Sequence, residues 1–399
     1  ERSAAMTWSD LASGALLLLL TARALFGGGA RIPWVQAGVG VWLILAPVIF
    51  RAPTAGGYLN DTLVGVLIIA FAVLIPQSMP MPGPDRPVGW SYSPSTWVQR
   101  APMVALGFAG FFLARYMTAD QLGHIPTVWD PLFGTGTARV LHSAIARAFP
   151  VSDAGLGAAV YLVEALMGLM GDRRRWRTMP WMVMFFGLLV VPLGIVSVAL
   201  IVSQPLTVGT WCFICLLTAL TTLLMIPLAL DEVVAMVQFL VQSHRDGQSV
   251  WRTFWLGGDA PSASDDTHTA GFGATAGVLV GDMVRGVTLP WTLLLSAALG
   301  VWLMFASSAL PMTGRVAASN VLAGALVATV ALTALAEVGR SARLINVLAG
   351  AWIVAAPWLL HGGVAATVNG ALVGVALVLL SLPRGAVRAT YGDWARYIR

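Results

Sequence analysis

The sequence predicts an all-α polytopic membrane protein with about 11 transmembrane helices, including a central four-helix bundle. Of the 399 residues, 58% are hydrophobic and only 10% are charged, and the mean hydropathy is +0.80. Charged residues are too few to form the surface of a water-soluble protein of this length. The helices follow from apolar runs of about 20 residues, the length that crosses roughly 30 Å of hydrocarbon.

The apolar runs fall into an early, a middle and a late group, separated by polar or Pro/Gly-rich stretches. We expect spans at about 8–26, 34–50, 59–76, 101–117, 153–171, 180–203, 211–229, 290–309, 316–336, 344–360 and 365–382. The expected domains are three helices in 1–79, a linker at 80–100, the four-helix bundle at 101–232, a connector at 233–289, four helices in 290–382 and a basic tail at 383–399.

The connector begins with a helical pattern. In "DEVVAMVQFLVQSHRD" at 231–246, apolar and polar residues alternate as in an amphipathic helix. We expect this helix to lie on the cytoplasmic membrane surface and to anchor the connector. A docking face for a soluble partner is the alternative.

Basic segments predict the orientation. The densest are "DRRRWR" at 172–177, "GRSAR" at 339–343 and the C-terminal tail. Lys and Arg gather on the cytoplasmic side of membrane proteins, so we expect these segments and the C-terminus there. The same topology places "GTWCFIC" at 209–215 on the extracytoplasmic face. The first helix then starts outside, and a missing upstream segment is an open alternative because the chain does not begin with Met.

The chain has only two cysteines, Cys212 and Cys215, at the start of an apolar run. Residues three apart on a helix lie on neighbouring faces, so these side chains can close a short disulfide. A helix N-terminus favours thiolate over thiol, and disulfides persist outside the cytoplasm. The pattern favours a redox pair. The alternative is that two small apolar side chains simply pack in a membrane helix.

Neither a metal nor a haem is predicted. A structural zinc needs four ligands, and no histidine is near the cysteines in the sequence. No histidine falls mid-membrane in a predicted span, so a haem held between two membrane helices has no support. All five are assigned to loops or the connector: His124, His142, His244, His268 and His361. The net charge of +5 is small and does not imply a nucleic-acid partner.

The outer helices repeat a short pattern. "GVWLILAP" at 40–47, "GVWLMFAS" at 300–307 and "GAWIVAAP" at 350–357 share a Gly, a Trp two residues later, and Pro or Ser seven after the Gly. "LNDTLVGV" at 59–66 matches "VNGALVGV" at 368–375, so a two-helix unit recurs. Its glycines permit close helix packing. These residues resemble the SPW repeat of bacterial membrane proteins, which implies a bacterial cytoplasmic membrane and no reaction.

The middle helices resemble another family. They have a first extracytoplasmic loop, a basic loop between the second and third helices, and CxxC opening the fourth. Together with "TARVLHS" at 137–143 and "PVSDAGLGAAVY" at 150–161, they look like the vitamin K epoxide reductase family over about 101–232. The resemblance implies electron transfer from extracytoplasmic thiols, through Cys212 and Cys215, to a ubiquinone-type or menaquinone-type quinone among the four helices.

The chain also departs from that family. Thr137 stands where the family has a loop cysteine, Ala219 replaces an aromatic hydroxyl of some members, and Asp153 replaces an Asn that holds the quinone in some members. Ser143 is kept. The internal thiol relay therefore cannot operate. Either an extracytoplasmic thioredoxin-like protein reduces the CxxC pair directly, or the fold was kept while turnover was lost.

Further polar residues are candidates for the quinone pocket or a proton relay, because quinone reduction takes up two protons. Glu164 lies three residues after Tyr161 in the second helix, where an ionisable side chain is costly. Its alternative is a carboxyl hydrogen-bonded to a neighbouring helix. For Asp153 the alternative is helix capping by Ser152 or Asp153. The candidates are Ser143, Asp153, Tyr161 and Glu164.

Two functional hypotheses remain open. One is a membrane thiol-disulfide oxidoreductase linked to a quinone. The other is a non-catalytic scaffold or accessory subunit of a larger membrane complex, embedded in the lipid bilayer beside other membrane subunits. A transporter is disfavoured because the repeated helices are almost free of charge.

Overall fold

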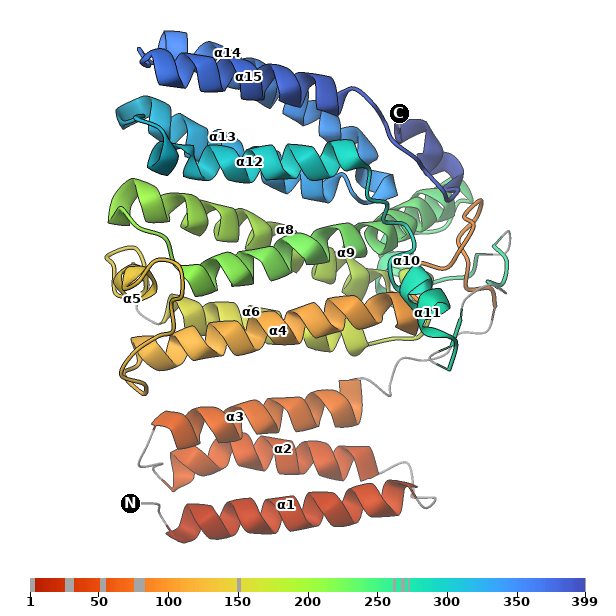
Figure 1. Cartoon of the computed structure of the whole chain (residues 1–399). Coiled ribbons are helices and arrows are strands. Elements are labelled where there is room, and N and C mark those ends of the chain that lie inside the picture. Colours follow the sequence, from red (N-terminus) through yellow and green to blue (C-terminus); the bar gives the residue numbers. More distant parts are fainter. Residues whose placement is uncertain are drawn as a thin grey trace. The chain divides into compact units, whose positions relative to one another are not determined.

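The fold is built from helices (Figure 1). The computed structural model describes residues 4–25, 32–50, 55–74, 83–148, 152–260, 263–266, 270–271 and 273–398. Within these ranges the only β-type pairings are three isolated bridges, which confirms the predicted all-α class. The chain divides into two compact units. The N-terminal unit comprises 1–79 with 169–171, and the main unit comprises 80–168 with 172–399.

Among the described residues, eight helices are long and apolar enough to cross a membrane. Two shorter apolar helices, Ile32–Pro47 and Leu59–Ala72, lie in the N-terminal unit. A helix of the structure overlaps each predicted run, including the 17-residue helix Asp153–Leu169. The multi-pass membrane class is confirmed, whereas the number of eleven crossings stays a prediction.

The N-terminal unit consists of α1 (Ala4–Leu25), α2 (Ile32–Ile49), α3 (Ala55–Ile69) and the π-helical turn η1 (Ala70–Leu74). Helices α2 and α3 approach closely at two glycines. A Cβ added to Gly40 would lie 2.7 Å from the Gly65 carbonyl oxygen, and one on Gly65 would lie 2.5 Å from the Gly40 oxygen. The Trp42 indole donates to Ser9 on α1 at 2.9 Å. The predicted repeat glycine and tryptophan thus make the helix contacts of this unit.

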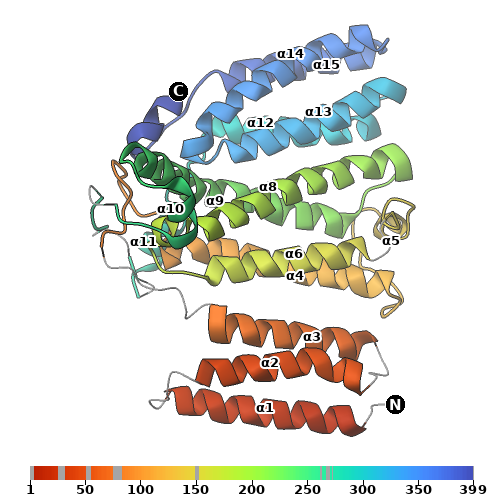
Figure 2. The same ribbon diagram turned by 180° about the vertical axis from the view of Figure 1, so that it is seen from behind.

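The main unit contains the central bundle, which comprises α4 (Trp97–Gln121), α6 (Asp153–Leu169), α8 (Pro180–Ser203) and α9 (Phe213–Arg245). Figures 1 and 2 show these four helices side by side. Helix α4 begins where the Thr96 hydroxyl accepts from Gln99 N. It packs on α6 through small residues: an added Cβ on Gly110 would lie 2.5 Å from the Tyr161 ring. The short helix α5 (Gly136–Leu141) lies in the loop between α4 and α6.

Residues 231–246, where we predicted a helix on the cytoplasmic membrane surface, do not form a separate helix, and their position at the membrane surface stays a prediction. These residues continue α9, which runs for 33 residues without interruption although Pro227 lies inside it. At 1.5 Å per residue this is about 50 Å, longer than the hydrocarbon layer. The second half of α9 is covered by protein, and Ala235 and Met236 are fully buried. An amphipathic pattern is equally typical of a helix that packs against protein.

The far end of α9 gathers segments that are distant in sequence. The predicted linker folds onto it, because Tyr92 OH donates to Asp231 at 2.9 Å and Trp90 Nε1 donates to Gln238 at 3.1 Å. The C-terminal tail joins them, since the Tyr391 and Trp90 rings are 4.9 Å apart. Segments of this region are α7 (Arg175–Thr178), α10 (Val250–Leu256), α11 (Ala276–Met283), η3 (Glu337–Leu344) and η4 (Gly392–Tyr397). We call it the basic end, because the three predicted basic segments meet here.

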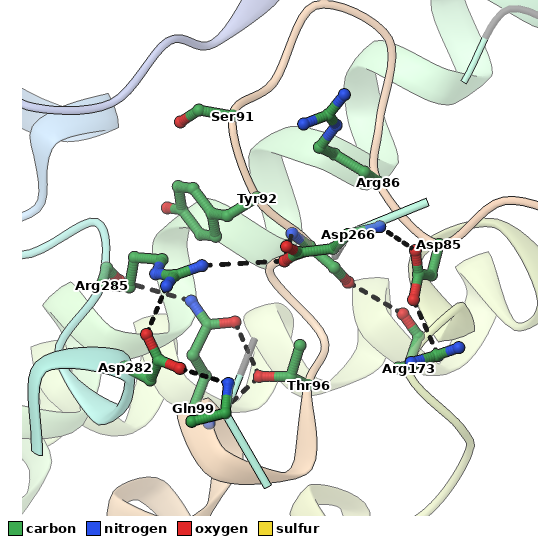
Figure 3. Close-up of polar contacts among 12 residues, drawn as sticks. Asp85, Arg86, Ser91, Tyr92, Thr96, Gln99, Arg173, Asp266, Asp282 and Arg285 are labelled. Atoms are coloured by element: carbon green, nitrogen blue, oxygen red, sulfur yellow. Dashed lines mark hydrogen bonds and ion pairs between the residues drawn. The ribbon is translucent and has the colours of Figure 1, made fainter. Parts of the chain in front are cut away.

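Ion pairs hold the loops of the basic end together (Figure 3). Arg285 pairs with Asp266 and Asp282. Asp85 accepts from the backbone of Asp266 at 2.7 Å and pairs with Arg173 at 2.7 Å. The pairs therefore join segments from three separate parts of the sequence.

The last four helices are α12 (Trp291–Ala309), α13 (Gly314–Thr333), α14 (Ile345–Leu359) and α15 (Val364–Ser381). They form two helix pairs with the same glycine contact as α2 and α3. A Cβ on Gly300 would lie 2.7 Å from the Gly324 oxygen, and one on Gly350 would lie 2.7 Å from the Gly374 oxygen. Close backbone approach is what small residues permit between membrane helices.

Candidate redox site

The two cysteines form a disulfide at the start of α9, with their Cα atoms 5.2 Å apart. Gly209, in the left-handed region at φ 72°, ends the π-helical turn η2 (Gln204–Val208) and turns the chain back towards α9. Cys212 is the N-cap of α9, and its sulfur accepts from Cys215 N at 3.0 Å. The CxxC spacing thus places both sulfurs at one helix terminus.

The two cysteines differ in their surroundings. Cys212 has an exposed fraction of 0%, and its backbone N–H donates to Gln204 Oε1 at 2.9 Å. Cys215 is only partly buried and lies 3.6 Å, sulfur to sulfur, from Met117 on α4. Only Cys215 lines the cavity within the bundle. Cys212 is therefore sealed, while Cys215 faces the cavity.

Thr137 joins the loop between α4 and α6 to the start of α9, next to Cys212. Its buried hydroxyl accepts from Phe213 N at 3.0 Å and donates to Asp130 at 2.7 Å. Asp130 also accepts from Thr137 N and from Phe133 N, each at 2.8 Å. Burial alone would raise the pKa of Asp130, but these hydrogen bonds outweigh it and hold the pKa below its usual value. A carboxylate thus ties the loop to the start of α9.

A cavity of about 510 Å³ lies among α4, α6, α8, α9 and the residues around α5. Its volume falls in the range of small-molecule sites, and its lining is mostly apolar. Four predicted site residues line it together: Ser143, Asp153, Tyr161 and Cys215. Ala219 also lines it.

The polar groups of the cavity have defined partners. Asp153 accepts from Gln121 Nε2 at 2.6 Å. Ser152 provides the predicted helix cap by accepting from Gly155 N at 2.9 Å, so Asp153 is not needed for that bond. Tyr161 OH donates to the Thr218 carbonyl at 2.7 Å. Because Thr218 lies three residues after Cys215, this phenol sits about one helical turn from the cysteine.

Glu164 lies one turn beyond Tyr161 on α6 and is 1% exposed. Neither carboxyl oxygen has a hydrogen-bond partner in the part of the chain that the structure describes. The alternative prediction, a hydrogen bond to a neighbouring helix, is therefore not seen there. Glu164 is not among the residues that line the cavity. It remains an unpartnered carboxyl group beside the cavity residue Tyr161.

Comparison with known proteins identifies the bundle. Residues 101–230 match the vitamin K epoxide reductase family. We call these residues the VKOR domain, after the vitamin K epoxide reductase (VKOR) family that they match. Residues 290–384 match the SPW repeat domain, and both predicted resemblances are confirmed over these ranges. No curated protein and no solved structure matches the chain.

The matches define what is shared with the families. The VKOR family comprises membrane thiol oxidoreductases associated with quinones. The N-terminal unit lies outside both matches, so its likeness to the SPW repeat stays a prediction. Within the described residues, no group of three His, Cys, Asp or Glu side chains could hold a metal ion.

Some residues of the VKOR site were missed from sequence. Asp130 is followed by Pro131, and its side chain accepts from Leu132 N and Phe133 N, as an aspartate that starts a turn does. Gln204 is a single amide in an apolar run, a signal for a buried polar partner. Met117 has no comparable signal, because a methionine in a membrane helix is indistinguishable from lipid-facing or core residues.

Proposed function

We propose that the VKOR domain passes electron pairs from an extracytoplasmic, thioredoxin-like thiol protein through Cys212 and Cys215 to a quinone of the ubiquinone or menaquinone type. The observation that carries this proposal is that Cys215 forms part of the wall of a 510 Å³ apolar cavity. A disulfide that only stabilised the fold would not need a cavity beside it.

The first half-reaction reduces the disulfide. A thiolate of the partner attacks the Cys212 sulfur, a mixed disulfide forms, and the Cys215 sulfur leaves towards the cavity. The partner's second thiol then attacks the mixed disulfide. The partner ends as a disulfide, and Cys212 and Cys215 end as thiols with two added electrons and two protons. Because Cys212 is sealed, the loop that carries Asp130 and Thr137 must open first.

The second half-reaction restores the disulfide. A bound quinone supplies an acceptor for two electrons and two protons. The cavity suits its ring and tail because the lining is mostly apolar with few polar groups. Ser143, Asp153 and Tyr161 would orient the ring beside Cys215. Glu164, one turn deeper and without a hydrogen-bond partner among the described residues, would hold a proton for the cavity.

The membrane side follows from charge. Arg-rich segments meet at the basic end, and the disulfide lies at the other end of α9. We infer that the basic end and the C-terminus face the cytoplasm of a bacterium and that the disulfide faces the extracytoplasmic side. This side is where oxidised thiol proteins are made.

The second candidate function is a non-catalytic membrane scaffold or accessory subunit. Two observations favour it: Thr137 replaces the family's loop cysteine, and Cys212 is fully buried. In that case the disulfide would persist in the presence of thiol proteins, and the cavity would hold lipid.

One experiment separates the two functions. The purified protein is reduced without oxygen, freed of reductant and mixed with a water-soluble quinone. The oxidoreductase proposal predicts that one quinol forms for each disulfide restored, followed by quinol absorbance and by thiol alkylation. The Cys212→Ser/Cys215→Ser double variant controls for direct chemistry. Thiols that stay reduced with the quinone in excess would support the scaffold.

A further inference from the structure

The SPW repeat domain contacts the VKOR redox site directly. The ring centroid of Phe305, on α12, lies 4.5 Å from that of Trp211, the residue before Cys212. The same ring stacks on the ring of Phe133, with the ring centroids 6.4 Å apart and an interplanar angle of 1°. Phe133 lies in the loop of residues 130–137, which we call the closing loop because it covers Cys212. One side chain of the SPW domain therefore touches both the residue before the CxxC and the loop that covers it.

The contact belongs to a larger apolar cluster between the two domains. The VKOR side contributes Ile201, Val202, Trp211 and Ala219, and the SPW side contributes Met304, Val321 and Ala325. Cys215 itself packs at the edge of this cluster. The disulfide thus lies between the cavity of the VKOR domain and the SPW helices.

Two sets of contacts hold the closing loop. On one side, Asp130 and Thr137 tie it to the start of α9 by hydrogen bonds. On the other side, Phe133 stacks on Phe305. Between them, a Cβ added to Gly136 would lie 2.4 Å from the Trp211 carbonyl oxygen, so the loop and Trp211 are in backbone contact. Movement of the loop away from Cys212 therefore requires Phe133 or Trp211 to separate from Phe305.

The aromatic residue is a departure within the repeats. In the three repeated segments, Phe305 corresponds to Leu45 and Ala355. The repeat that contacts the redox site is the one that carries Phe. Packing of the repeat does not require an aromatic ring at this position, because the other two segments form the same glycine contact without it.

We propose that the SPW repeat domain controls access to the VKOR disulfide, with Phe305 as the positioning residue that keeps the loop closed over Cys212. This inference rests on the proposed exchange of Cys212 with external thiols. It gives the SPW domain a regulatory role: any change that shifts α12 relative to α9 changes how readily the disulfide is reduced.

The test measures the rate at which dithiothreitol reduces the disulfide of the full-length protein, with alkylation of the new thiols as the readout. Phe305→Ala should speed reduction roughly tenfold, because two aromatic contacts that hold the closed loop are lost. Phe305→Leu should lie between, and Phe305→Tyr should react like the wild type. Phe112→Ala, which removes a 61% exposed phenylalanine from α4, is the matched control.

A second readout excludes simple unfolding. At equilibrium with a dithiothreitol buffer, Phe305→Ala should keep the reduction potential of the wild type, because easier access speeds reduction and reoxidation equally. Its thermal unfolding should resemble that of Phe305→Leu. Equal reduction rates in wild type and Phe305→Ala, or a faster rate accompanied by a shifted potential, would overturn the proposal. The test uses no quinone. A protein that does not react with quinone can therefore still show the effect of Phe305→Ala, so the result does not depend on electron transfer to a quinone.

Discussion

The two ends of the VKOR bundle differ in whether a buried ion pair holds them together. At the basic end, Arg175 and Glu232 form an ion pair in which both side chains are at most 1% exposed. Ser95 also donates to Glu232. At the disulfide end, aromatic contacts and one carboxylate hold the loop over Cys212 beside a large cavity. Breaking a buried ion pair costs more free energy than separating an aromatic pair. The chemistry is therefore proposed at the end that can open.

The basic end also joins the two domains. Glu337, between α13 and α14, accepts from Tyr391 OH at 2.8 Å and from the backbone of Arg388 and Ala389 in the tail. Burial, together with the nearby Glu337 carboxylate, raises the pKa of Tyr391, so the phenol stays protonated and donates this bond. The tail thus joins the SPW domain to the VKOR domain far from the disulfide. The contacts of Phe305 at the other end can therefore change while the two domains stay joined.

The largest effect is expected from the cysteines. Cys215→Ser should reduce quinone-linked thiol oxidation to the uncatalysed rate, because the sulfur facing the cavity is lost. Its unfolding midpoint should change little, since a disulfide between residues three apart closes a very short loop. Quinol formation and thermal unfolding measure the two effects. A variant that kept its turnover would show that the disulfide is not part of the electron path.

A large loss of stability is expected at the basic end. Glu232→Ala leaves Arg175 buried without its ion-pair partner and should lower the free energy of unfolding by about 3–5 kcal/mol. Arg245→Ala is the matched control. Its pair with Asp393 is more than half exposed, and it should cost about 0–1 kcal/mol. Denaturant unfolding in detergent measures both, and similar losses in the two variants would remove the contrast between buried and exposed pairs.

A smaller effect is expected from filling the cavity. Gly157 lines it, and nothing lies within 4 Å of a Cβ added there. Gly157→Phe should lower the affinity for quinone roughly tenfold, equivalent to about 1.4 kcal/mol, and leave reduction by dithiothreitol unchanged. Gly14→Phe, at another open helix position in α1, controls for the mutation itself. If quinone reduction were unchanged in Gly157→Phe, the acceptor would bind elsewhere.

The smallest effect is a dependence on pH. The folded-state pKa of Asp130 is lowered, so its contribution to loop closure is fully present above the unfolded value of about 3.9 and is lost as pH falls through the folded pKa. For each protein, the rate of disulfide reduction by a phosphine is divided by that protein's rate at pH 6. Below about pH 4 this ratio should rise in the wild type, which loses the Asp130 carboxylate, and should rise less in Asp130→Asn. Parallel profiles would contradict a closing role for this carboxylate.

Many features of the fold and of the redox site follow from local patterns in the sequence. Apolar length predicted the helices, CxxC placed the sulfurs at a helix start, and the repeated glycines predicted close helix pairs such as Gly350 with Gly374. These features depend on residues near each other in the chain. The N-terminal unit shows the same geometry between Gly40 and Gly65, which supports its interpretation as a further repeat.

Other features that were missed from the sequence depend on distant residues. Phe305 lies more than 90 residues from Trp211, and nothing local links them. Tyr92 and Asp231 are 139 residues apart, so residues 83–96 resembled a linker. These segments bury the apolar face of residues 231–246. Without them, the amphipathic pattern of that stretch is the same as that of a helix on a membrane surface. Burial by long-range contacts cannot be inferred from periodicity alone.

Photolabelling with an azido-quinone, followed by identification of the labelled peptides, tests most directly whether a quinone binds beside Cys215. We expect labelling on α6 around Gly157 and Tyr161 and on α9 around Thr218, suppressed by excess unlabelled quinone and reduced in Gly157→Phe. Labelling confined to other helices, or labelling that excess quinone does not suppress, would contradict a quinone site beside Cys215.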